Sequence, residues 1–266
     1  MARAPGAPGP FVYACSVAVA IFVLIPLVIP IWMSISDTAF VTFPPRGFTL
    51  RWYTKILNEP EFVASFRFSV LLAVAVAALA LIIGTPAAIA LVRYSFHGRA
   101  AIQAFVLSPL IFPMLVSGIA LLRLFTSLGT HDAAIKLLLG HTVVAVPYVV
   151  RTVSASLSLL DPRIEEAART LGASRLATFW LIVRPQIVPG IVAGGLFAFV
   201  TSFDNYPISM WLADAVSVPL PMTVFVLIQR FFDPGIAAIC TLMMLFSFVL
   251  VFAIEKATGL KRAMSM

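Results

Sequence analysis

Charged side chains are scarce in this sequence. Aspartate, glutamate, lysine and arginine together make up 11% of its 266 residues, whereas soluble domains carry about 25%. Hydrophobic residues make up 61%, and the mean hydropathy is +1.06. This balance excludes an ordinary soluble globular protein and favours a chain that lies in lipid.

Residues that hold metals or carry redox chemistry are also few. Cys15 and Cys240 lie far apart within apolar runs, so we expect them to pack. His97, His131 and His141 have no partner at metal-ligand spacing, and each is expected to be solvated or packed. No nucleophile–base pattern and no G-x-x-x-x-G-K-[ST] phosphate loop occurs in the sequence. We therefore expect no enzyme activity, no metal and no bound cofactor in this chain.

Long apolar runs dominate the sequence instead. Six of them are long enough to cross a hydrocarbon core of roughly 30 Å as helices. Strands are disfavoured because their edges would leave backbone groups unpaired in lipid. The first run is too long for the apolar part of an export signal, so we expect it to be retained. The predicted fold is an all-α membrane protein with six transmembrane helices, at Phe11–Met33, Phe68–Val92, Ile102–Leu124, Ile135–Leu157, Ile187–Leu212 and Ile236–Ile254.

The positive charges gather in the short segments on one side of these runs. A net charge of +7 could suggest nucleic acid, but cations beside membrane spans set orientation instead. We predict that both termini are cytoplasmic, and that the chain contacts lipid and no nucleic acid. Residues 1–10 are expected to be a disordered tail, 11–255 a single transmembrane domain and 256–266 a second tail. Residues 34–67 are predicted to form an outer loop with a short helix.

A polar segment, residues 158–185, separates the fourth and fifth spans on the predicted cytoplasmic side. Asp161 followed by Pro162 is typical of a helix start. Gly172 can adopt the left-handed conformation that ends helices, and Ser174 can cap a second helix, which Pro185 is expected to interrupt. The pattern predicts a helix, a glycine turn and a second helix. A solvated connecting loop with ordinary caps is the alternative.

This segment resembles the EAA loop of ABC-type importer permeases. The resemblance rests on Glu166-Ala167-Ala168, then Gly172, then Ile182 and Pro185; Arg184 stands where that family has leucine. The wider stretch 161–174 is most similar to the spermidine/putrescine branch. Further similarities to the family occur at Gly84-Thr85-Pro86-Ala87-Ala88, Ser108-Pro109-Leu110-Ile111-Phe112-Pro113, Phe203-Asp204-Asn205 and Leu220-Pro221-Met222.

The resemblance implies a type I importer permease in a bacterial inner membrane, working by alternating access. Such a chain forms half of the pathway beside a second permease subunit, expected here to be a different chain. An ATPase dimer that uses Mg-ATP supplies energy, and a periplasmic binding protein delivers the solute. The resemblance places the ATPase-coupling contact on Glu165, Glu166, Ala167, Ala168, Arg169, Gly172, Ala173 and Ser174.

Asp204 is the acid expected to lie within a span, roughly 25 Å along the fifth and close to the outer face. Ionisable residues in spans tend to face cavities, so it could attract a cation. Neighbouring polar and aromatic residues could assist it: Ser202, Asn205, Tyr206 and Trp211. In the alternative, Asp204 caps a helix break before Pro207, and the two aromatic residues are interfacial anchors.

Two classes of rival function remain open. A permease for ferric iron, phosphonate or thiamine would share the same core and the same loop. A self-contained secondary carrier or a membrane enzyme would need convergent polar residues at the middle of the membrane, and these spans offer almost none. The sequence therefore favours an ATP-driven importer permease, with a polyamine as the solute.

Overall fold

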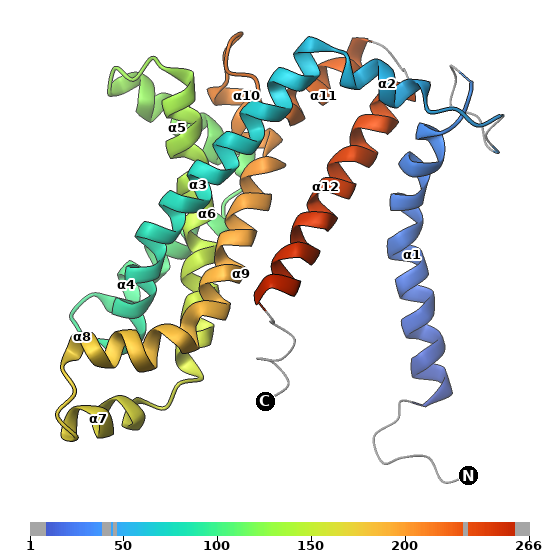
Figure 1. Ribbon diagram of the computed structural model, residues 1–266. Coiled ribbons are helices and arrows are strands. Elements are labelled where there is room, and N and C mark those ends of the chain that lie inside the picture. The colour runs from blue at the N-terminus through green and yellow to red at the C-terminus, as the bar shows by residue number, and fades with distance from the viewer. Residues whose placement is uncertain (1–8, 39–43, 45–46, 231–233, 259–266) are drawn as a thin grey trace, which may run out of the picture. The chain divides into compact units, whose positions relative to one another are not determined.

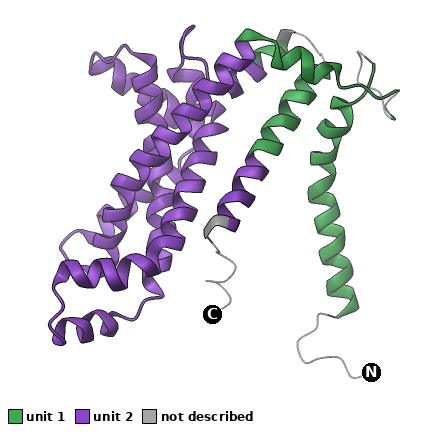
Figure 2. Ribbon diagram, viewed as in Figure 1, with its two compact units in different colours: residues 1–60, 226–246 green, residues 61–225, 247–266 purple. Residues whose placement is uncertain are grey.

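The structure is a computed structural model that describes residues 9–38, 44, 47–230 and 234–258. Most of both predicted tails, at 1–8 and 259–266, lies outside the described residues. The described part of the chain consists of helices without strands (Figure 1). Contacts divide it into two compact units, which Figure 2 colours separately: residues 1–60 with 226–246, and residues 61–225 with 247–266.

The first unit contains a long apolar helix followed by the short helix predicted for the outer loop. The indole Nε1–H of Trp52 donates to the Ser36 carbonyl at 2.8 Å, and the hydroxyls of Tyr53 and Ser34 are hydrogen-bonded at 2.6 Å. These contacts hold the short helix against the end of the long one. The helices are α1 (Pro10–Ser34), α2 (Arg51–Leu57) and the first half of α12 (Pro234–Thr258).

The second unit contains the remaining helices, and α11 and α12 each continue from one unit into the other. Their bounds are α3 (Pro60–Arg93), α4 (Arg99–Leu107), η1 (Ser108–Leu110), α5 (Met114–Ser127), α6 (Ala133–Ser158), α7 (Pro162–Thr170), α8 (Arg175–Thr178), η2 (Phe179–Val183), α9 (Arg184–Phe203), α10 (Tyr206–Leu212) and α11 (Leu220–Arg230). Among the described residues of both units, five helices are long and apolar enough to span a membrane, and a bent pair raises the number to as many as six. The six-span prediction agrees with the larger number.

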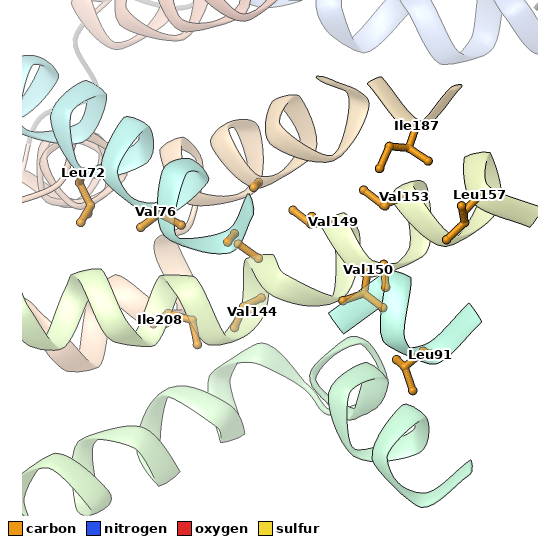
Figure 3. Packing of buried hydrophobic residues seen from close by; sticks show 14 of the residues in the cluster. Leu72, Val76, Leu91, Val144, Val149, Val150, Val153, Leu157, Ile187 and Ile208 are labelled. Atoms are coloured by element: carbon orange, nitrogen blue, oxygen red, sulfur yellow. The ribbon is translucent and has the colours of Figure 1, made fainter. Parts of the chain in front are cut away.

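The buried core of the second unit is centred on α6 (Figure 3). Val149, Val153 and Leu157 of α6 are fully buried, as is Ile187 of α9. Lipid supplies no hydrophobic force between helices, so close backbone approach through small residues matters more. At Gly190 of α9 an added Cβ would lie 2.5 Å from the Ser156 hydroxyl oxygen. Glycine therefore allows α9 to pack closely on α6.

Three details of the predicted spans were wrong. The third span is not one helix, because α4–η1 and α5 meet at a bend of 108° between Pro109 and Pro113, which lack backbone N–H donors. The fifth span is broken after Phe203 and restarts at Tyr206. The helix that begins at Arg175 is not interrupted by Pro185 but continues through a π turn to Phe203.

Candidate functional site

Helix α7 is capped as its sequence predicts. The Asp161 carboxylate accepts the Arg163 N–H at 2.9 Å, with Pro162 in the first turn. Such a cap satisfies a backbone donor that the helix itself leaves free. Glu165 lies in the first turn and Arg169 in the last, where the helix dipole favours a negative and a positive charge respectively. Local chemistry therefore accounts for where this short helix begins and for the order of its charges.

A tight turn at Gly172 connects α7 to α8. Gly172 has φ of +90°, a left-handed conformation that other residues adopt at a cost. The Ala173 N–H reaches back to the Ala168 carbonyl at 3.0 Å, which completes a Schellman motif. The Ser174 hydroxyl then accepts the Ala177 N–H at 3.2 Å and starts α8. The turn brings the two helices to lie beside each other.

The segment presents small and charged residues to its surroundings. Glu166, Ala167 and Arg169 are exposed, as are Gly172 and Ser174. The remaining residues of the predicted coupling set are half-buried: Glu165, Ala168 and Ala173. Small side chains leave the backbone accessible, so another protein surface can approach it closely. We call residues 158–185 the coupling loop from here on, after the role that the sequence predicts for it.

The second helix of the coupling loop continues directly into a membrane span. A single helix runs from Arg175 to Phe203, and Figure 1 shows α8 joining α9 without a gap. Its π turn is closed by the Arg184 N–H, which donates to the Phe179 carbonyl. This wider turn lets the helix pass into Pro185, which has no N–H to give. The Arg184 guanidinium lies over the Trp180 ring, 4.9 Å from its centroid.

The other candidate region lies where α9 ends, at the end of the span remote from the coupling loop. Asp204 does not cap the next helix, contrary to one of the two sequence interpretations. Asn205 does so, since its side-chain oxygen accepts the Ile208 N–H at 3.0 Å. Asp204 is exposed, and no residue in the described part of the chain pairs with its carboxylate. The acid is therefore available to a ligand.

The predicted aromatic partners of Asp204 are engaged with different neighbours. The ring of Tyr206 lies 4.6 Å from that of Phe225, centroid to centroid, at a tilt of 39°. Trp211 packs on α5, where a Cβ added to Gly118 would lie 2.6 Å from its ring. The buried indole N–H of Trp211 has no hydrogen-bond partner among the described residues. The two rings therefore pack against different helices, Tyr206 on α11 and Trp211 on α5.

Sequence reasoning missed a buried network built on His141. Its Nδ1 lies 2.9 Å from the Ser202 hydroxyl and its Nε2 lies 3.2 Å from the Ser209 hydroxyl. Ser209 in turn donates to the Asn205 carbonyl. One side chain of α6 thereby joins α9 to α10 across the break. A polar residue within an apolar span tends to face the bundle interior, and that was the available signal.

Known proteins are similar to this chain in sequence. Residues 80–259 match the family described as "Binding-protein-dependent transport system inner membrane component". The chain is 33% identical over 206 residues to the spermidine/putrescine transport system permease protein PotC of Haemophilus influenzae, covering 77% of this chain and 80% of that protein. It is 32% identical over 230 residues to the putrescine transport system permease protein PotI of Escherichia coli, covering 84% and 82%.

A solved structure has the same fold. It is a bacterial ABC transporter involved in the import of the acidic polysaccharide alginate, and it matches with a TM-score of 0.66 over 94% of this chain and 95% of that one. The two sequences are 19% identical.

Proposed function

Because this chain belongs to the family of binding-protein-dependent transport system inner membrane components, we propose that it is a permease subunit of an ATP-driven polyamine importer. It would form half of the translocation pathway in a bacterial inner membrane, with the coupling loop in the cytoplasm. The observation that carries this proposal is the exposed coupling loop, which continues as one helix into α9.

The partners follow from the chain's own composition and from its family. The sequence has no phosphate loop, so Mg-ATP would be hydrolysed by a separate ATPase dimer. A second permease subunit, a different chain, would complete the pathway, and a periplasmic binding protein would deliver the solute. Glu166, Ala167 and Gly172 would contact the ATPase, and the other residues of the coupling set would shape that surface.

The coupling loop can act on the spans through the rigid connection at its end. When the ATPase dimer closes, α8 would move with it, and α9 must follow because the two are continuous. Close packing at Gly190 would carry α6 along with α9. Such a paired movement would open the pathway towards the binding protein and close it after the solute has entered, which is alternating access.

A polyamine is the solute that the remote end of α9 supports best. The Asp204 carboxylate is exposed, and it has no partner within the described residues. It can therefore accept hydrogen bonds from a protonated amine and neutralise its charge. Ser202, Asn205, Tyr206 and Trp211 would shape this part of the pathway. Relatives named for spermidine and putrescine transport agree with a cationic solute.

The test is uptake of radiolabelled spermidine and putrescine by cells that lack this chain, with and without the gene restored. We expect ATP-dependent uptake only with the gene. Purification from the membrane should also recover an ATPase and a second permease subunit. Uptake of another solute in place of polyamines would overturn the choice of solute. Activity of the isolated chain in liposomes without ATP would overturn the whole proposal.

A further inference from the structure

An ion pair joins the coupling loop to a span other than α9. Arg93 is the last residue of α3, and its Nη2 lies 2.7 Å from Oε1 of Glu165 in the first turn of α7. The same nitrogen donates to the Leu160 carbonyl at 3.3 Å, just before the cap of α7. The two side chains are 15% and 19% exposed. Screening by water and salt is weaker for such a pair than for one on the surface.

The surroundings of this pair are hollow. A cavity of about 340 Å³ lies between the end of α3 and the coupling loop, and its walls include Ile89, Arg93, Glu165, Arg169, Phe179 and Val183. Apolar packing across this space is limited by the cavity. The arginine reaches across this space, and its two polar contacts join the end of α3 to α7 and to Leu160 just before it.

Helix α3 also has specific contacts at its opposite end. The Ser69 hydroxyl accepts the Leu220 N–H at 2.7 Å, and the hydroxyls of Ser65 and Thr223 are hydrogen-bonded at 2.7 Å. Twenty-four residues of helix separate Ser69 from Arg93, or about 36 Å at 1.5 Å per residue. A displacement of Arg93 can thus reach the start of α11 through one helix.

We propose that Arg93 and Glu165 form a joint that stays closed through the transport cycle, so that α3 moves together with α7. The coupling loop would then act on two spans: on α9 through the continuous helix, and on α3 through the ion pair. Arg93 would be a positioning residue, since it would act through α7 by its contacts with Glu165 and the Leu160 carbonyl. This inference rests on the proposed function.

A charge exchange tests the joint in the complete transporter. We would compare Arg93→Glu, Glu165→Arg and the double variant for spermidine uptake and for ATP hydrolysis by the purified complex. Each single variant should lower uptake about tenfold, the size of a typical coupling effect, while the ATPase still copurifies. The double variant should recover most of the uptake because the pair is restored with reversed charges. Arg99→Glu is the matched control: Arg99 is exposed at the start of α4, and uptake should not change.

Neutral variants provide a second measurement. If the pair acts as one joint, the Arg93→Gln, Glu165→Gln double variant should take up as much spermidine as either single variant. If its loss of uptake equals the product of the two single losses, the residues act independently and the joint is overturned. The joint would also be overturned if the charge-exchanged double variant took up as little spermidine as the single variants do. If the unmodified transporter takes up no polyamine, the proposed function fails instead, and that outcome is distinct because it appears before any variant is compared.

Discussion

Asn205 caps α10 through its side-chain oxygen, and this leaves the carboxylate of its neighbour Asp204 free of any partner in the described structure. Two adjacent polar residues at one helix break thus differ in function. Asn205 accepts the Ile208 N–H, and the Asp204 carboxylate can accept hydrogen bonds from a ligand. An acid that served as the cap would be stabilised already and would gain less from a bound cation.

Asp204→Asn should therefore weaken polyamine uptake. We expect a loss of about 10- to 100-fold, since a hydrogen bond to a charged group contributes about 1.5–3 kcal/mol, and each 1.4 kcal/mol is a factor of about ten. The measurement is initial uptake of radiolabelled spermidine at matched amounts of membrane protein. Copurification of the ATPase should not change, because the coupling loop lies at the other end of α9.

Asp214→Asn is the matched control for this prediction. Asp214 follows α10 at the same end of the spans, and its carboxylate accepts the N–H groups of Ser217 and Val216 at 2.7 and 3.0 Å. These N–H groups lower the pKa of the Asp214 carboxyl, so it is charged at neutral pH. If both variants lose uptake equally, general loss of negative charge explains the effect and Asp204 has no special role.

Gly172→Val should abolish coupling and leave the protein in the membrane. A side chain in the left-handed conformation costs about 1–2 kcal/mol, and relief of that strain would turn α8 away from α7. Gly98→Val carries the same kind of strain, since Gly98 has φ of +82° and both glycines have open space around them. Uptake should be lost in the first variant and kept in the second. Equal uptake in the two would remove the turn from the coupling mechanism.

His141→Ala should destabilise the second unit. The substitution removes the imidazole that is hydrogen-bonded to the buried Ser202 and Ser209 hydroxyls. A buried polar group left unsatisfied costs about 1–3 kcal/mol. A lower thermal midpoint of the purified complex would confirm it. His131→Ala removes an exposed imidazole from a loop and should leave the midpoint unchanged. A shift of the same size in both variants would contradict the role of the network.

Gly190→Ala should also lower the thermal midpoint. The added Cβ would lie 2.7 Å from the Thr152 backbone carbonyl oxygen, which cannot turn aside, and such overpacking costs about 1–3 kcal/mol. Gly195→Ala, on the same helix, meets the end of the Leu81 side chain at 3.0 Å, which can rotate. Alanine also favours the helix by about 1 kcal/mol over glycine. The control should therefore be neutral or slightly stabilising, and equal losses would contradict the close packing of α9 on α6.

The coupling loop could be predicted well because its structure depends on neighbours in sequence. Asp161 and Ser174 each cap a helix within three residues of themselves, and the backbone hydrogen bonds at Gly172 are local, from Gly172 to Arg169 and from Ala173 to Ala168. Hydrophobic length likewise located the spans. Their number and approximate ends depend on the thickness of the hydrocarbon core, which every span must match.

The remaining features depend on contacts between segments distant in sequence. Hydrophobicity does not distinguish a kinked span from one bent by 108°, because the residues around Pro109 are apolar in either case. The partners of His141 lie 61 and 68 residues away, and those of Arg93 are equally remote. Helix α11 was not predicted because the spans were located by their length, and its eleven residues are too few to cross a membrane.

The π turn at Phe179–Val183 has a geometric consequence for the coupling loop. Each helical residue advances the side-chain direction by about 100°, and a π turn contains one residue more than an α turn. The extra residue is taken up within one full turn, so deleting Leu181 would restore regular winding and leave the direction of everything before it nearly unchanged. Deleting Leu176 instead, before the π turn, would remove one step of about 100° and turn the exposed side of α7 around the span axis. The π turn thus lets this permease carry one more residue ahead of Gly190 and still offer its loop to a partner in the same direction.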